Sequence, residues 1–257
     1  MLVLPVLILG KDLAAHFWRS IWFFVPLIVF IQVFINVFFA LNYRIYSLLE
    51  KEDWPALVQE LKKQIFSKGR YRSRLVTLLI NTHLVLSEIQ AITELEKELT
   101  AKSKNKNPVN HNALGFGAAR IVQKDFQGAA DFFGSRINGS IPCKAADAEW
   151  LRWYHGFSLF LSRRFEEAAA YFIILAREGK ESIPSGLSAY FLHKHLSTAL
   201  PLRSAELEKE AENGKNRITL SVQKKSGWDR EVKHKETEIY AVILSSYIQN
   251  TGDYLYN

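Results

Sequence analysis

The chain has 257 residues and 48% of them are hydrophobic, so it can bury a large core in one extended domain or two small ones. Lysine and arginine exceed aspartate and glutamate by 33 to 26, which gives a formal net charge of +7. The excess is spread along the chain without an unbroken block of five or six basic residues, so we expect no nucleic acid partner. The single cysteine, Cys143, excludes an internal disulfide and cysteine-rich metal sites but does not identify the compartment.

Residues 20–41 (SIWFFVPLIVFIQVFINVFFAL) carry no charge and are mostly apolar, and about 20 apolar residues cross roughly 30 Å of hydrocarbon. Aromatic side chains stand on both sides of its apolar centre, where interfacial belts are found: Trp18, Trp22, Tyr43 and Tyr46. A buried core helix is the alternative, because Gln32 and Asn36 are polar and lie one turn apart on one face. We predict a transmembrane helix that contacts membrane lipid through residues 20–41.

The order of charges predicts that this segment is an uncleaved, single-pass anchor in the inner membrane. The first ten residues are apolar, the charges of Lys11 and Arg19 come after them, and no small-residue cleavage site follows Leu41. Arg44 and Lys51 follow the segment, so the bias in positive charge between the two flanks is small. It favours the N-terminus inside and places the soluble domain in the periplasm.

Two segments in the middle of the chain share a pattern of small and aromatic residues. In each, a glycine is followed 12 residues later by an alanine and four residues after that by a phenylalanine: Gly117, Ala129 and Phe133, then Gly156, Ala168 and Phe172. A short polar turn that ends in an aromatic residue separates glycine from alanine, and the two glycines are 39 residues apart. Small residues at both places let two antiparallel helices approach closely, while the phenylalanine fills the space toward the next repeat.

This pattern resembles the tetratricopeptide repeat (TPR) family, whose unit is a helix-turn-helix of about 34 residues. The resemblance implies an all-α fold in which the N-terminal transmembrane helix is followed by a right-handed superhelix of antiparallel helix pairs. The glycine, alanine and phenylalanine positions of this pattern are called the marker places. Two weaker copies in the same register have other residues at the marker places: Ile45, Leu57 and Leu61 in the first copy, and Ile80, Ile92 and Glu96 in the second. The resemblance is strong over residues 110–178 and useful over 42–178. Chance similarity between generic helical hairpins is the alternative.

The segments between and after the repeats predict the remaining elements. Polar stretches with proline or glycine predict loops at 100–110 and 137–145, and residues 182–200 predict a further helix. In the charge-rich stretch 203–236 we expect a helix as far as Asn213, and residues 217–222 alternate enough to predict a short strand. Residues 239–257 predict a helix and then a turn at Gly252-Asp253-Tyr254 whose second helix is missing.

The motifs of the common enzyme and metal sites are missing from the sequence. The seven histidines make no HExxH pair, and the glycines form neither a phosphate-binding loop nor a GxSxG elbow. We therefore expect no catalytic residues, no metal and no cofactor. An enzyme assembled from dispersed residues remains open.

The TPR resemblance implies that the first helix of each pair lines a concave groove that holds the partner. The residues in question are Trp150, Trp153, Phe157 and Phe160 in the fourth repeat and Leu114, Ala118 and Ile121 in the third. An apolar groove of this kind predicts docking of an apolar helix of another protein, anchored by the aromatic residues. The alternative is that this aromatic row is core, covered by the helix at 182–200 or by the C-terminal segment folding back.

These features predict three regions: a hydrophobic segment and anchor at 1–41, about four repeats at 42–200, and a charged segment with a C-terminal capping helix at 201–257. The expected function is a non-catalytic protein-protein interaction scaffold that assembles a bacterial envelope complex. Its organisation is similar to that of the TPR proteins in the periplasmic collar of spirochaete flagellar motors. The expected partners are other proteins of a membrane-associated complex, with oligomeric assembly left open. Two alternatives remain: a periplasmic ligand-binding TPR subunit of a transporter, and an enzyme with an unrecognised site.

Overall fold

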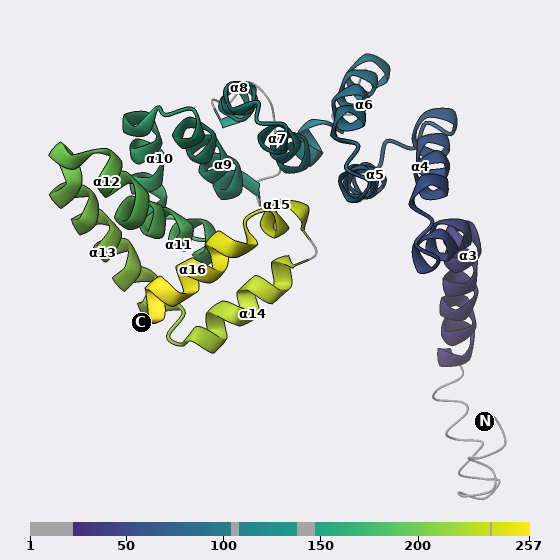
Figure 1. Ribbon diagram of the computed structural model, residues 1–257. Coiled ribbons are helices and arrows are strands. Elements are labelled where there is room, and N and C mark those ends of the chain that lie inside the picture. Colours follow the sequence, from purple (N-terminus) through teal and green to yellow (C-terminus); the bar gives the residue numbers. More distant parts are fainter. Residues whose placement is uncertain (1–22, 104–107, 138–146, 237) are drawn as a thin grey trace, which may run out of the picture. The chain divides into compact units, whose positions relative to one another are not determined.

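The computed structural model describes residues 23–103, 108–137, 147–236 and 238–257, and this part of the chain is all-α (Figure 1). The described residues contain fourteen α-helices, α3 to α16, together with a few π- and 3₁₀-helical turns. The chain divides into two units, of which the first ends at Glu60 and the second begins at Leu61. That division falls inside the region 42–200 expected to hold the repeats.

The first unit contains α3 (Phe24–Glu50) and most of α4 (Trp54–Lys62). Helix α3 is bent, because its two straight pieces, Pro26–Ala40 and Asn42–Glu50, meet at 62°. Among the described residues no single straight helix is long and apolar enough to cross a membrane, and these two pieces reach that length only together. The first three residues of the predicted span, 20–22, lie outside the described residues, as do Met1 to Arg19.

Consecutive helices pair in the second unit as the repeat pattern predicts. The pairs are α5 (Ser73–Val85) with α6 (Ile89–Lys102), α7 (Ala113–Val122) with α8 (Phe126–Ile137), and α9 (Ala148–Leu161) with α10 (Phe165–Glu178). The loop expected at 100–110 is shorter than predicted, because α6 continues to Lys102 and a 3₁₀ turn begins at Asn110. The loop expected at 137–145, with Cys143, falls almost wholly outside the described residues.

Four turns share one backbone geometry and fix the register of the helix pairs. The middle residue of each three-residue turn has a positive φ between 52° and 62°: Glu52, Ser87, Lys124 and Arg163. In every turn the next residue donates its N–H to the carbonyl five residues back, for example Asp125 to Arg120 at 3.0 Å and Arg164 to Leu159 at 2.9 Å. This is the hydrogen bond that closes a helix when a left-handed residue follows it. The turns are 35, 37 and 39 residues apart, and the marker places of the weak copies keep the same offset from their turns as in the strong ones.

The glycine and phenylalanine of each strong repeat meet as their spacing predicts. A β-carbon on Gly117 would lie 2.0 Å from the ring of Phe133, and one on Gly156 would lie 3.0 Å from the ring of Phe172. Ala129 and Ala168 are fully buried, like both phenylalanines. The small residues therefore bring the paired helices together around a buried ring.

The predicted helix at 182–200 is confirmed, and the predicted strand at 217–222 is wrong. Helix α11 (Ser182–Phe191) continues through a π-helical turn into α12 (Ser197–Ala199), and a 3₁₀ turn leads to α13 (Ser204–Ser221). Residues 217–221 instead continue α13, which packs against α10 and α11. There the Arg217 guanidinium donates to three carbonyls at the end of α10, those of Leu175, Ala176 and Gly179. The Leu175 carbonyl also accepts from the Gly179 N–H, so Arg217 adds a second donor there, and its contacts with the three carbonyls tie α13 to α10.

The last three helices are α14 (Lys225–Lys235), α15 (Ile239–Val242) and α16 (Ser245–Tyr256). The predicted turn at Gly252-Asp253-Tyr254 is wrong, because these residues lie inside α16 and the break falls earlier, at Ile243 and Leu244. Gly252 instead allows close packing, since a β-carbon there would lie 2.9 Å from the Trp228 indole nitrogen. In Figure 1 these helices, in yellow-green and yellow, return to the end of the helix pairs, where α16 packs against α11.

Candidate functional site

The structure buries the aromatic row that was predicted to form the partner-binding groove. Trp150 and Trp153 have no exposed surface, Phe157 is 4% exposed, and Phe160 is partly buried. Aromatic rings from later helices cover them: Phe191 of α11 lies edge-on to Trp153 at 5.6 Å, and Tyr247 of α16 lies 5.9 Å from Phe157. The open groove predicted here is therefore wrong for this chain, and the alternative of a core covered by residues 182–200 and the C-terminal segment describes the structure.

The groove residues predicted in the third repeat are buried as well. Leu114, Ala118 and Ile121 have 4%, 0% and 8% of their surface exposed. Their helix, α7, contacts α5, α9 and the C-terminal α15, so the first helices pack on one another and on the returning segment. None of these three side chains is open to a partner.

Polar contacts secure the same returning segment over the fourth repeat. The Trp150 indole donates to a Glu181 carboxylate oxygen at 3.0 Å, and the Trp150 ring lies 5.0 Å from that of Tyr240. The Tyr154 hydroxyl donates to the Tyr240 carbonyl. Burial raises the pKa of the Tyr154 hydroxyl and of the Glu181 carboxyl, although Lys235, 3.9 Å from Glu181, opposes the second shift.

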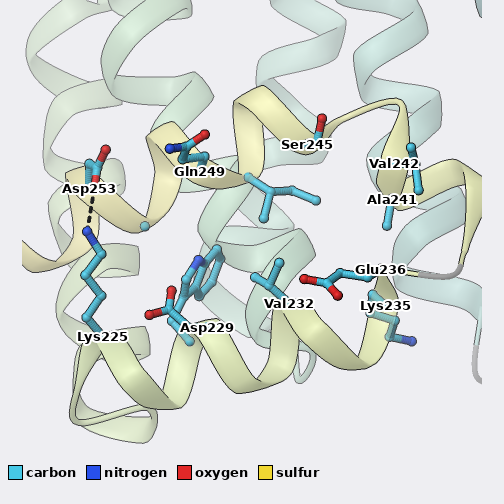
Figure 2. Close-up of a pocket in the computed structure, with 13 residues that line it drawn as sticks. Lys225, Asp229, Val232, Lys235, Glu236, Ala241, Val242, Ser245, Gln249 and Asp253 are labelled. Atoms are coloured by element: carbon cyan, nitrogen blue, oxygen red, sulfur yellow. Dashed lines mark hydrogen bonds and ion pairs between the residues drawn. The ribbon is translucent and has the colours of Figure 1, made fainter.

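A cleft that the sequence did not predict lies between α14 on one side and α15 with α16 on the other (Figure 2). Its volume is about 460 Å³, which lies within the range of ligand and peptide-anchor sites. Its lining is apolar along the middle, with Trp228, Val232, Ala241, Val242 and Ile248. Figure 2 shows Val232 pointing from α14 toward α16, with Ala241 and Val242 at one end of the cleft.

Two glycines hold the indole of Trp228 at the base of this cleft. A β-carbon on Gly186 of α11 would lie 2.9 Å from the ring, and one on Gly252 of α16 would come equally close to its nitrogen. Trp228 is thus 2% exposed although it belongs to a helix whose other residues are mostly exposed. The one sequence signal for this cleft was a tryptophan in a charged stretch, with a valine one turn later.

Charged groups stand along the rim of the cleft, and they are unequally paired. Lys225 and Asp253 form an ion pair of 2.7 Å that bridges α14 and α16 at one end (Figure 2), which raises the pKa of the Lys225 amine. Lys235 pairs with Glu181 at 3.9 Å. Asp229 and Glu236 form no ion pair with the described residues. The free rim charge is therefore negative, above an apolar floor.

No group of three or more His, Cys, Asp or Glu residues is placed to hold a metal ion within the described ranges. The histidines are dispersed, and His155 and His195 have their pKa values lowered, chiefly by burial. His155 Nδ1 lies 3.0 Å from the Ala130 carbonyl, which fixes its ring against α8.

Comparison with known proteins gives a family without giving an activity. The chain is 28% identical over 198 residues to an uncharacterized protein of Treponema pallidum (strain Nichols), a match that covers 74% of this chain and 61% of the relative. The chain thus spans less than two thirds of the length of that relative, and no solved structure matches it. A protein-family model described as "Uncharacterised Treponema protein", not a TPR model, matches residues 91–257. Because this match covers well over half of the sequence, the chain belongs to that Treponema family.

Proposed function

We propose that the chain is a membrane-tethered, non-catalytic interaction scaffold whose helix pairs form a TPR-like right-handed superhelix. The observation that carries the proposal is the turn geometry repeated at Glu52, Ser87, Lys124 and Arg163, which sets consecutive helix pairs in one register. Arrays of such pairs present extended surfaces to other proteins, and each pair is stabilised by its neighbours. The departure from a simple array is the C-terminal segment, which fills the predicted groove and presents the α14–α16 cleft in its place.

The exposed apolar surface of α3 supports the membrane tether. Along Phe24–Phe39 nearly every described side chain is at least 40% exposed, including Phe30 at 68% and Phe34 at 64%. A helix that is apolar on all sides is stable only when protein or lipid covers it. The tether, single-pass with the folded domain in the periplasm, is tested by extracting membranes with alkaline carbonate. Retention of the chain in the pellet supports it, and release of the intact chain refutes it.

The cleft between α14 and α16 fits an amphipathic helix of a partner protein. Its apolar floor would receive two or three large apolar side chains, and the unpaired Asp229 and Glu236 would receive basic residues flanking that face. Val242, which is 47% exposed, lies at the edge of the cleft where a bound helix would cover it.

Site-specific photo-crosslinking in cells tests this docking site. A photoreactive amino acid replaces Val242 in the cleft or, as a matched control, Leu220, which is 79% exposed on α13 and outside the cleft. We expect one discrete adduct from position 242 and none of that mass from position 220. Reversing the rim charge with Asp229→Lys and Glu236→Lys should abolish the adduct, whereas Asp229→Glu should keep it. An adduct that survives charge reversal, or that forms equally at position 220, refutes docking in the cleft.

A more specific proposal is that this scaffold assembles the periplasmic collar of a flagellar motor. The similarity of its organisation to that of collar TPR proteins motivates this proposal, and the family to which the chain belongs is described only as an uncharacterised Treponema protein. Deleting the gene and imaging motors in frozen cells tests the assignment. A missing or incomplete collar supports the assignment. An unchanged motor refutes it, and the scaffold would then belong to another envelope complex.

The size of the cleft also favours a second function, that of a ligand-binding subunit serving a transporter. A volume of about 460 Å³ holds a small organic molecule, and the rim offers carboxylates, an amide and a hydroxyl from Gln249 and Ser245. Native mass spectrometry of the purified full chain separates the two functions. A bound small molecule that Gln249→Trp displaces would assign the cleft to a ligand rather than to a partner helix.

A further inference from the structure

A run of exposed basic residues lies where the second unit begins. Six of the thirteen residues from 62 to 74 are basic, and all six are exposed: Lys62, Lys63, Lys68, Arg70, Arg72 and Arg74. We call this set the cationic patch. The sequence has no aspartate or glutamate between Glu60 and Glu88, so no acidic residue interrupts the patch.

The six side chains form no ion pair with the described part of the chain. Arg70 donates to the Gln64 side chain at 3.1 Å, a bond that orients its guanidinium without neutralising it. Two acidic residues of α6, Glu94 and Glu98, line a hollow with Lys62 and Lys63. Glu98 is held by Lys102 at 3.7 Å, so the hollow stays basic on balance.

The position of the arginines does not stabilise the helix beside them. Helix α5 begins at Ser73, directly after Arg72, with no acidic residue in its first turn. Cations near a helix N-terminus oppose the helix dipole, so Arg72 and Arg74 cost stability there. Phe66 and Tyr71, both half-buried, stand between the basic residues. Basic residues interleaved with aromatic rings are typical of protein surfaces that contact lipid headgroups.

With the proposed tether in place, the short connection along the chain keeps this patch near the bilayer. Twenty residues separate Leu41, the end of the charge-free segment, from Lys62, and most of them are helical in α3 and α4. At about 1.5 Å per helical residue and about 3.5 Å for each of the three turn residues, their reach is at most roughly 35 Å. A nucleic acid or a soluble acidic protein would have to enter the space between the patch and the bilayer, whereas the proposed tether places lipid headgroups at its edge.

We propose that the cationic patch holds the second unit against the anionic headgroup surface of the bilayer in which the N-terminal helix is anchored. The inference rests on the proposed membrane tether and adds a second contact to it. It requires only an anionic leaflet on the side of the folded domain. The contact acts through charge, so it weakens as salt rises and does not depend on which basic residue carries the charge.

The full chain in vesicles tests the contact. Cys143 is replaced by serine, and a solvent-sensitive fluorophore is attached to Ser67→Cys within the patch or, as a control, to Asn250→Cys on α16, both exposed positions. Vesicles contain either 30% phosphatidylglycerol or phosphatidylcholine alone. We expect the fluorophore at position 67 to be shielded from acrylamide only in anionic vesicles and only at low salt, with position 250 quenched equally in both.

Matched charge variants sharpen the test. Lys68→Gln, Arg72→Gln and Arg74→Gln together should lower the equilibrium constant for surface contact by roughly a hundredfold, since each basic residue contributes about fivefold. Lys68→Arg, Arg72→Lys and Arg74→Lys should leave it nearly unchanged. Loss of shielding in the charge-conserving variant would overturn the proposal.

Further outcomes separate the patch from the tether and from other anions. Equal quenching in both vesicle types, with the chain still resistant to carbonate, would refute the patch and leave the tether intact. Release of the chain by carbonate together with salt-sensitive vesicle binding would refute the tether and support the patch. Shielding in neutral vesicles on addition of inorganic phosphate or of RNA would overturn the lipid assignment in favour of that anion.

Discussion

The ring of Phe133 fills the space that a β-carbon on Gly117 would need, with its Cζ atom 2.0 Å from that position. At the equivalent place in the next repeat, the ring of Phe172 leaves 3.0 Å beside Gly156. Both rings are fully buried, so neither can swing into solvent. The two repeats therefore have the same register, but the glycine–phenylalanine contact is closer in the repeat that contains Gly117.

Gly117→Ala should destabilise the chain more than Gly156→Ala. We expect about 1 to 3 kcal/mol for Gly117→Ala, because overpacking forces Phe133 and the α7–α8 pair to shift, and less than that for Gly156→Ala. Urea denaturation of both variants beside the parent measures the difference. Equal losses, or a larger loss at Gly156, would show that the contact at Gly117 is not the tighter one.

Trp153→Ala should cost about 3 to 5 kcal/mol, because it removes a fully buried ring packed against Phe157 at 5.0 Å and Phe191 at 5.6 Å. The matched control is Leu220→Ala, an exposed apolar residue whose loss should stay within about 0.5 kcal/mol. Thermal melting followed by circular dichroism measures both. If the Trp153→Ala protein melts like the parent, Trp153 is not part of the core and belongs to an open groove.

Arg217→Leu should loosen the contact between α13 and α10, because three carbonyls at the end of α10 would lose the guanidinium, and only that of Leu175 would keep a backbone donor, the Gly179 N–H. We expect a loss of about 1 to 3 kcal/mol. Arg217→Lys should recover only part of it, because an ammonium group cannot match the planar fork that reaches three carbonyls. Hydrogen exchange at the C-terminal turn of α10 reports the contact locally, and full rescue by lysine would contradict this role.

The free energy of unfolding should fall as the pH drops below about 6.5. In the folded chain the pKa values of His83, His155 and His195 are lowered, chiefly because burial disfavours the charged ring. The unfolded chain, with histidine pKa values near 6.5, then takes up protons first, which stabilises it relative to the folded state.

Replacing one histidine isolates its share of this dependence from that of Glu181, whose raised pKa acts in the opposite direction. His155→Asn keeps a donor for the Ala130 carbonyl and should flatten the slope of unfolding free energy between pH 7.5 and 5.5. Urea denaturation at several pH values gives the slope for parent and variant. Identical slopes would mean that His155 titrates alike in both states.

The sequence alone predicted the elements that depend on local and neighbouring contacts. The spacing of Gly117, Ala129 and Phe133 predicted the close approach of α7 and α8. Small residues at facing positions of two paired helices allow that approach wherever the hairpin forms. The same register placed the weak repeat around Ile80 correctly relative to the turn at Ser87. The basic residues at 62–74 are separated by uncharged ones, so the criterion of an unbroken block of basic residues does not detect them, although the sequence contains all six.

Only the tertiary structure decided what the aromatic row and the C-terminal segment do. The sequence of a helix face that carries Trp153 and Phe157 is the same whether a partner protein or a later segment of the chain covers that face. Burial by either one is driven by the same hydrophobic effect. The contact of Tyr247 with Phe157, 90 residues away in sequence, settles this, and local periodicity cannot report it. Likewise residues 217–221 alternate like a strand but continue α13, which packs against α10 and α11 and from which Arg217 reaches carbonyls about 40 residues earlier. Long-range contacts outweigh local pattern here because the energy of burying and pairing these groups exceeds the small differences in backbone propensity.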